Sequence, residues 1–405
     1  MELSLFLMTA AFVVSKAARD ALYFSVGGLH DLPLAYLGMA GLALPVALAT
    51  LAAMRIVGAG RVRVLAPAAC AVGLAALSVV VRPGGGLVMT AVFLAIPLAF
   101  GVLLSLAWLL TADLLAGAPA EALPTAYARV GAASLAGGVA GALLARLTSA
   151  MLAPSHFFLA AAAALMAVAV LLAWTERTYP SRCVPAAGAA RGSAMPLAVF
   201  AHPRVRLIAL MAMSAALAGV LIEFLFYAAA SRRAGGGASA IAIFADLYLG
   251  VNLIALLTQL AVMPPLQRAL GAGGVLLILP AVVGALAPAA FLVAALRSVL
   301  RVAEGGLKAS VHRVAWEQVF AFVEPVHRSP AKLLADGTAT RMGEALAALV
   351  ILTGMRAGGG TATAETWASA LLVVCGLAWV AATLRWRRQQ ADDSARAVAL
   401  RVPDG

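Results

Sequence analysis

Four polar residues, Lys16, Arg19, Asp20 and Tyr23, interrupt the first long apolar stretch of this chain. Their spacing of three and four residues places the four side chains on one face of a helix. A charge near the middle of a bilayer costs at least ~2.5 kcal/mol, so this face must point toward protein or water. Because two cations oppose one acid, we expect an anion-binding face in a central cavity, with Asp20 orienting or neutralising a cation. The alternative is a salt-bridge cluster that only holds this helix to a partner.

A second charged line occurs late in the chain, where Arg297, Arg301, Glu304 and Lys308 are spaced by four, three and four residues. This spacing again follows one helical face, and Glu304 precedes Lys308 in the favourable order. One interpretation is a charged wall that faces a transport pathway. The other is an amphipathic helix at the membrane surface, or a cluster paired within its own turn.

Further polar residues stand alone in apolar surroundings in the second half. Glu223 and Asp246 each lie within a long apolar run, so either could carry a coupling proton or pair with a cation on a facing helix. Asn252 and Gln259 are seven residues apart, about two turns along one helical face. They are expected to bond a solute in a polar cavity or to hold helices together.

Enzyme chemistry finds little support in the sequence. The nucleophile elbow GxSxG, the zinc motif HExxH and the phosphate loop GxxxxGK[ST] do not occur. Cys70, Cys183 and Cys375 are far apart and have no metal-ligand spacing. We therefore expect a protein that is not an enzyme and has no cofactor, metal or structural disulfide.

Composition sets the class of fold. The 405 residues are 64% hydrophobic and 11% charged, and mean hydropathy is +1.01, which excludes an ordinary soluble protein. Apolar runs long enough to cross a ~30 Å hydrocarbon core recur throughout. We predict an all-α polytopic membrane protein with about 12 spans in two six-helix bundles. The predicted spans are 3–26, 33–54, 64–81, 87–112, 126–150, 155–174, 205–230, 239–263, 273–296, 297–311, 342–355 and 365–384.

The distribution of charged residues predicts the membrane topology, and the polar segments between the apolar runs predict the domain limits. With the amino terminus inside, most Lys and Arg residues fall in inward segments, which predicts cytoplasmic termini. The excess of Arg over Lys, with abundant Ala, Gly and Leu, suggests a bacterial genome, so we expect a bacterial inner membrane. The net charge of +12 is spread over separate loops, so no nucleic-acid partner is expected. We expect a monomer whose partners are the lipid bilayer and a small-molecule solute. The predicted domains are an N-terminal bundle (1–174), a cytoplasmic linker (175–204), a C-terminal bundle (205–388) and a polar tail (389–405).

Small residues dominate the fifth predicted span, where Ser134 and Gly138, and then Gly137 and Gly141, are four residues apart. Such spacing allows two helix backbones to approach closely. The helix is expected either to slide against a neighbour during transport or to be packed statically.

Three segments resemble the ATP/ADP translocases of plastids and obligate intracellular bacteria, a distant branch of the major facilitator superfamily. They are KAARDALYF at 16–24, the block at 307–346 and, more weakly, 251–271. The resemblance implies a twelve-helix, two-bundle carrier that exchanges nucleotides. It places the family's first-helix Lys and Asp on Arg19 and Asp20, and its late Lys near Arg341. Both positions change Lys to Arg, which can still bind phosphate but with different geometry. The loop after the second span lacks the acid of the wider superfamily's signature.

These observations together predict a secondary transporter that works by alternating access on an anionic solute, such as a nucleotide or another phosphorylated metabolite. Transport is expected to proceed by exchange or proton coupling. The alternatives are a proton-coupled exporter or lipid transporter of the same fold, and a non-transporting assembly or sensor protein. The expected solute-binding residues are Lys16, Arg19, Asp20, Tyr23, Arg301, Lys308 and Arg341. Glu223 and Asp246 are the proton-coupling candidates, and Asn252, Gln259 and Glu304 are expected in the polar cavity.

Overall fold

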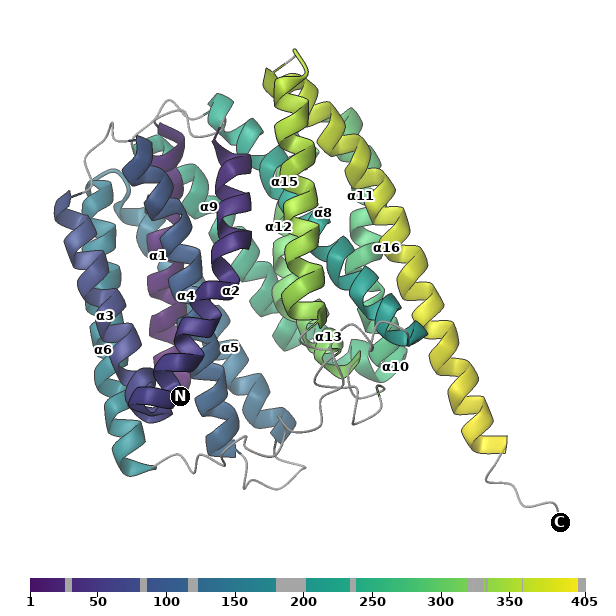
Figure 1. Ribbon diagram of the computed structural model, residues 1–405, viewed down its shortest axis with the longest axis horizontal. Coiled ribbons are helices and arrows are strands. Elements are labelled where there is room, and N and C mark those ends of the chain that lie inside the picture. Colours follow the sequence, from purple (N-terminus) through teal and green to yellow (C-terminus); the bar gives the residue numbers. More distant parts are fainter. Residues whose placement is uncertain are drawn as a thin grey trace. The chain divides into compact units, whose positions relative to one another are not determined.

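The computed structural model describes residues 1–25, 31–80, 86–115, 123–179, 202–233, 238–319, 323, 331, 334–358 and 360–399. All regular secondary structure in these ranges is helical (Figure 1). The helices form twelve continuous segments within these ranges, because α9, η2 and α10 follow one another without a gap, as do α12, η3 and α13, and η5 and α15. The prediction of an all-α polytopic membrane fold is confirmed.

Eight helices in the described part of the chain are long and apolar enough to cross a membrane. The first helix, α1 (Glu2–Ser25), does not meet this criterion because every window of 18 residues within it holds three or more charged residues. Charged side chains are costly inside a membrane, so the protein around α1 must cover its charged face.

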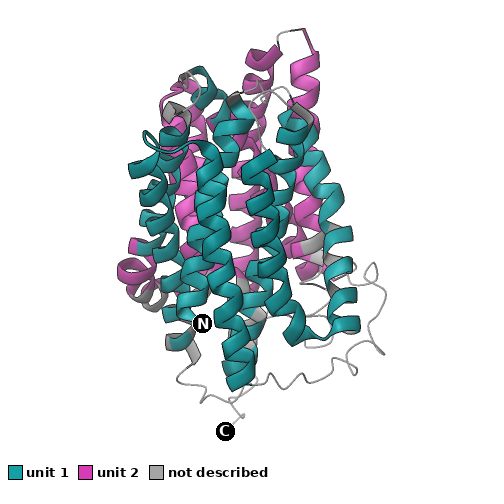
Figure 2. Ribbon diagram, turned by 90° about the vertical axis from the view of Figure 1, so that its left-hand side faces the viewer, with its two compact units in different colours: residues 1–185, 227–256 teal, residues 186–226, 257–405 magenta. Residues whose placement is uncertain are grey.

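The chain divides into two compact units (Figure 2). Unit 1 contains residues 1–185 and 227–256, and unit 2 contains residues 186–226 and 257–405. The end of α8 and all but the last residue of α9 thus belong to the unit of the first six helices. The limits of the two bundles and of the linker, given above, stay predictions, and residues 180–201 lie outside the described part.

Unit 1 is built around α1. The helices of this unit are α1, α2 (Leu32–Val57), α3 (Ala59–Val80), α4 (Gly86–Leu115), α5 (Leu123–Thr148), α6 (Pro154–Thr178), the end of α8 (Pro203–Arg233) and α9 (Ala238–Leu257). The first helix packs on α4, α5 and α6, and α3 packs along α6. This central position explains why the charged face of α1 can be covered by protein.

Glycines allow α1 and α5 to lie against each other. A side chain at Gly137 or Gly141 would overlap the backbone of α1 at Phe6 or Ala10. Thr9 and Ser134 share a hydrogen bond of 2.8 Å between the same two helices. The small residues of the fifth span therefore serve a close backbone contact, in the way that small residues do in membrane helices generally.

Unit 2 holds the start of α8 and the later helices. They are η2 (Thr258–Val262), α10 (Met263–Leu276), α11 (Ile278–Leu292), α12 (Leu296–Leu307), η3 (Lys308–His312), α13 (Arg313–Val319), η5 (Leu334–Ala339), α15 (Thr340–Arg356) and α16 (Gly360–Ala399). The last helix packs on α11 and α15. Within this unit α16 also contacts α8, where Cys375 Sγ donates to the Ser214 carbonyl at 3.3 Å.

Helical structure extends beyond several of the predicted spans. The tenth span was expected to end at residue 311, but helical structure continues through η3 and α13 to Val319. Helix α16 continues to Ala399, so the first part of the predicted tail (389–405) is helical, and the limits of the tail as a domain stay predictions. The reason is that residues 389–399 contain no Pro or Gly, so nothing in them terminates a helix. Residues 400–405 lie outside the described part.

Candidate functional site

The ionic face of α1 is buried inside unit 1. Arg19 and Asp20 have exposed fractions of 2% and 0%. Arg19 donates from Nε to Asp20 Oδ1 at 2.7 Å, and its Nη2 donates to the same oxygen. Its Nη1 donates to the carbonyl of Phe93 in α4 at 3.3 Å, and its guanidinium carbon lies 4.2 Å from the centre of the Phe93 ring. Arg19 is thus held on three sides.

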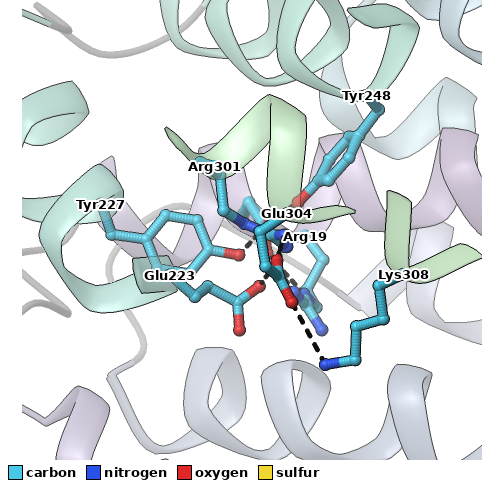
Figure 3. Close-up of polar contacts among 8 residues, drawn as sticks. Arg19, Glu223, Tyr227, Tyr248, Arg301, Glu304 and Lys308 are labelled. Atoms are coloured by element: carbon cyan, nitrogen blue, oxygen red, sulfur yellow. Dashed lines mark hydrogen bonds and ion pairs between the residues drawn. The ribbon is translucent and has the colours of Figure 1, made fainter. Parts of the chain in front are cut away.

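The second carboxylate oxygen of Asp20 binds two tyrosines. Tyr227 of α8 donates its hydroxyl to Asp20 Oδ2 at 3.0 Å, and the Tyr248 hydroxyl of α9 donates to the same atom (Figure 3). A carboxylate accepts about four hydrogen bonds, so these two hydroxyls and Arg19 saturate Asp20. Charge-assisted bonds of this kind are stronger than neutral ones, and they fix the orientation of both charges.

Lys16 and Tyr23 complete the face. The Lys16 ammonium lies 4.7 Å from the centre of the Tyr248 ring, within the range of a cation–π interaction. Lys16 is half-buried, and with Arg19 and Asp20 it leaves a formal charge of +1. The Tyr23 ring stacks on Phe93 at 4.2 Å, and its buried hydroxyl has no hydrogen-bond partner among the residues that the structure describes.

A second ionic cluster lies in unit 2, on α8 and α12. Arg301 bonds Glu223 at 3.3 Å and Glu304 at 2.7 Å, and Glu304 bonds Lys308 at 3.3 Å (Figure 3). Glu304 is buried, whereas Lys308 is exposed at the start of the π-helix η3. Two cations and two acids alternate, so this cluster is formally neutral. Short π-helices occur frequently at functional sites, so η3 is a candidate functional segment.

Arg297, the first of the four charges in the predicted line, bonds a different partner from the other three. Arg297 pairs with Glu365 of α16, and both side chains are largely buried. The remaining three follow the predicted line, but with Glu223 added from α8. Arg341 of α15 pairs with Glu344 in its own helix at 2.6 Å and is about two-fifths exposed.

Asp246 pairs with a cation on a facing helix, which is one of the two roles expected for it, and its role in proton coupling stays a prediction. Asp246 accepts a hydrogen bond from Arg146 Nε of α5 at 2.7 Å, and the two side chains are about half exposed. This pair could not be predicted from the residues around Asp246, because Arg146 lies in a distant part of the sequence.

The shared face predicted for Asn252 and Gln259 stays a prediction. α9 ends at Leu257 and the π-helix η2 begins at Thr258, so the regular helical spacing between the two residues is interrupted. The Asn252 amide donates to the Tyr248 carbonyl in its own helix at 2.7 Å, and a side chain at Gly138 would overlap it. Whether either residue bonds a solute stays a prediction.

Unit 1 also contains a buried arginine, Arg63, that was not among the predicted site residues. Arg63 of α3 bonds Asp113 of α4 and, at 3.0 Å, Glu176 of α6. Tyr227 and Tyr248 were missed as well. The acids bonded to Arg63, Asp113 and Glu176, lie near the ends of α4 and α6. An acid near the end of an apolar run is visible in the sequence, so these two residues could have been selected. A tyrosine in an apolar run gives no such signal, since most such residues serve packing.

Comparisons with solved structures show that this chain shares its fold with several transporters. A variant of the nucleoside transporter NupG has a TM-score of 0.63 and 17% identity, with 94% of this chain and 98% of that chain covered. The POT family transporter PepTSo has a TM-score of 0.66 and 12% identity over 95% and 98%. An auto-inhibited POT family peptide transporter has a TM-score of 0.61 and 14% identity over 95% and 97%.

The sequence comparisons give no closer relative. No family model matches the chain, and no curated protein matches it. At identities this low, the structural matches establish the fold alone, because one fold serves many substrates. Membership of the ATP/ADP translocase family stays a resemblance.

Proposed function

We propose that this chain is a secondary active transporter that moves an anionic solute by alternating access. The single observation that carries the proposal is the buried ionic face of α1, which combines Lys16, Arg19 and Asp20 in a fold shared with solved transporters. Ionic side chains inside membrane-spanning helices are expensive to bury, and they commonly mark solute or ion pathways. The formal charge of +1 suits an anion.

A purely structural role would favour a neutral arrangement. Removing charge from water costs several kcal/mol per ion in real proteins, so a face that only joined helices would gain from equal numbers of cations and acids. We assign solute binding to the face of α1, whose own residues are two cations and one acid, and assign to the cluster of unit 2 a role in gating or coupling.

Proton coupling, if present, is assigned to Glu223. This acid lies on α8, four residues before Tyr227, and it shares Arg301 with Glu304. A proton taken up by Glu223 would release Arg301 from one of its two acids. Asp246 is a weaker candidate, because its half-exposed pair with Arg146 resembles a surface gate more than a buried proton site.

The solute class follows from charge and from resemblance. The translocase-like segments favour a nucleotide or another phosphorylated metabolite, and the printed names of the structural neighbours add nucleosides and peptides to the compounds worth testing. An exporter or lipid transporter of the same fold, and a non-transporting assembly or sensor protein, are the competing functions. We place the chain in a bacterial inner membrane as a monomer with cytoplasmic termini.

Uptake into liposomes tests the proposal. Purified protein is reconstituted, and labelled ADP, ATP, glucose 6-phosphate, inorganic phosphate, uridine and dialanine are tested with and without preloaded unlabelled compound. An exchanger accelerates uptake when the counter-solute is inside, whereas a proton-coupled carrier responds to an imposed pH gradient. If neither condition moves a phosphorylated compound, and a fluorescent lipid analogue moves instead, the anionic-solute proposal fails.

A further inference from the structure

The last helix, α16, carries an exposed apolar stripe. It is one continuous helix of 40 residues, and it includes a candidate membrane span from Gly360 to Ala391 (Figure 1). Exposed residues recur along it at spacings of three and four, which is one face of an α-helix. The members of this stripe are Trp367, Ala370, Val374, Leu377, Ala381 and Leu384. In a membrane-spanning helix, an exposed apolar face of this kind is covered by lipid hydrocarbon.

The length of the stripe matches the hydrocarbon layer of a bilayer. Leu384 follows Trp367 by 17 positions. The two residues are therefore ~26 Å apart along the helix axis, against a hydrocarbon thickness of ~30 Å. Exposed tryptophans are enriched at membrane interfaces, and Trp367 is 44% exposed. Trp367 thus marks one boundary of the hydrocarbon, and Leu384 marks the other.

Three arginines begin where the stripe ends. Arg385, Arg387 and Arg388 are exposed, whereas Trp386 between them is buried. Successive residues of an α-helix are turned by ~100°, so Arg388 lies nearly opposite Trp386, and the other two arginines flank it. Within the part of the chain that the structure describes, none of the three arginines has an ion pair or a side-chain hydrogen bond. They present an arc of positive charge away from the core of unit 2.

The end of α16 is held against α10, so the arc has a fixed position. A side chain at Gly273 of α10 would lie 2.6 Å from Gln390 Oε1 and 3.4 Å from Arg387 Cγ. The carbon stem of Arg387 thus passes close to α10, while its side chain remains exposed as a whole.

The next acids in the sequence, Asp392 and Asp393, belong to a later turn of α16. The backbone of Asp392 is ~12 Å beyond Leu384 along the helix axis, at 1.5 Å per residue. The headgroup layer on each side of a bilayer is only ~5–7 Å thick. Residues 385–388 therefore lie at the level of the headgroups, and the two acids lie beyond it.

We propose that the end of α16 is a binding site for the headgroups of anionic phospholipids, formed by Arg385, Arg387 and Arg388. A lipid phosphate lies just outside the hydrocarbon, at the level that these arginines occupy. A guanidinium binds phosphate oxygens through two parallel N–H donors, and basic residues beside a membrane span attract anionic lipid. This inference goes beyond the proposed function, since it requires only that α16 crosses the bilayer.

Native mass spectrometry of the purified full chain in detergent micelles tests the inference. The probes are dioleoylphosphatidylglycerol and dioleoylphosphatidylcholine, which have the same acyl chains and differ in headgroup charge. The measured quantity is the ratio of their affinities for the protein. A triple glutamine variant (Arg385→Gln, Arg387→Gln, Arg388→Gln) removes the charge, and the corresponding triple lysine variant keeps it. Arg356→Gln is the matched control, because Arg356 is exposed at the end of α15, beside the opposite end of α16.

We expect the unsubstituted protein to bind phosphatidylglycerol ~10-fold more tightly than phosphatidylcholine. One headgroup reaches one or two of the three arginines, and each cation near the surface strengthens the attraction ~5-fold. The preference should fall to ~2-fold or less in the triple glutamine variant, because the attraction of all three cations is lost. It should persist in the triple lysine variant and in Arg356→Gln. Arg388→Gln alone should lower the preference ~3-fold, because it removes the side chain that lies farthest from Trp386.

A preference of less than ~2-fold in the unsubstituted protein, or an unchanged preference in the triple glutamine variant, overturns the inference. If the triple variant does not fold, an unchanged preference in Arg388→Gln overturns it instead. An equal fall in Arg356→Gln would show a general effect of net charge and would also overturn it. If millimolar glycerol 3-phosphate displaces the bound phosphatidylglycerol, the arginines bind a free phosphate ester, and the lipid site is refuted.

Discussion

Replacing Asp20 by alanine tests whether the face of α1 is a buried charge network. The substitution leaves the Arg19 guanidinium buried without its counter-ion, and breaking a buried pair in this way costs ~3–5 kcal/mol. It also deprives Tyr227 and Tyr248 of an acceptor, at ~1 kcal/mol for each hydroxyl. Because Arg19 keeps the Phe93 carbonyl and the side chains can adjust, these terms do not add in full, and we expect the free energy of unfolding to fall by at least ~3 kcal/mol.

Equilibrium unfolding in mixed micelles, followed by circular dichroism during titration with dodecyl sulfate, measures this loss. Asp20→Asn keeps an oxygen that both tyrosines can reach, so it should lose less than Asp20→Ala. Glu2→Ala is the matched control, because Glu2 pairs with Arg129 on the same helix bundle but both side chains are about half exposed or more. We expect this control to lose less than ~1 kcal/mol. An Asp20→Ala variant as stable as Glu2→Ala would refute the buried-network argument.

Three further substitutions test the packing and the remaining ion pairs. Gly137→Ala should lower the melting temperature in detergent, with a loss of ~1–3 kcal/mol from overlap with the α1 backbone, whereas Gly131→Ala on the same helix has open space and should be neutral or stabilising; equal melting temperatures would contradict the close α1–α5 contact. Glu365→Ala leaves Arg297 largely buried and should destabilise by ~3 kcal/mol in dodecyl sulfate titration, and a smaller loss than that of Glu344→Ala would argue against a buried pair. Asp246→Ala breaks a half-exposed pair and should change unfolding free energy by less than ~1 kcal/mol, so a much larger loss would show that the pair is structural.

The helical fold and the charged face of α1 follow from the sequence because both depend on local spacing. Apolar length predicts spans directly, and residues at i, i+3, i+4 and i+7 share a face in any α-helix. The contacts of Arg301 and Lys308 with Glu304 could also be predicted, because each pair lies within one or two turns of a helix.

The partners from distant helices could not be predicted. Tyr227 and Tyr248 lie more than 200 positions after Asp20, and a single sequence gives no information about which apolar runs meet. The Arg146 partner of Asp246 was hidden for the same reason. The π-helix η2 begins at Thr258, and sequence periodicity could not predict it because periodicity assumes a regular α-helix.

Counterflow into liposomes by the unsubstituted protein and by Lys16→Ala and Lys16→Arg is the most direct test of the central claim. The account requires that preloaded phosphorylated compound accelerates uptake of the labelled compound by the unsubstituted protein. Lys16→Ala should abolish this acceleration, and Lys16→Arg should retain part of it because the charge remains. Acceleration by Lys16→Ala equal to that of the unsubstituted protein, or no acceleration by any of the three, would contradict a solute site on the ionic face of α1.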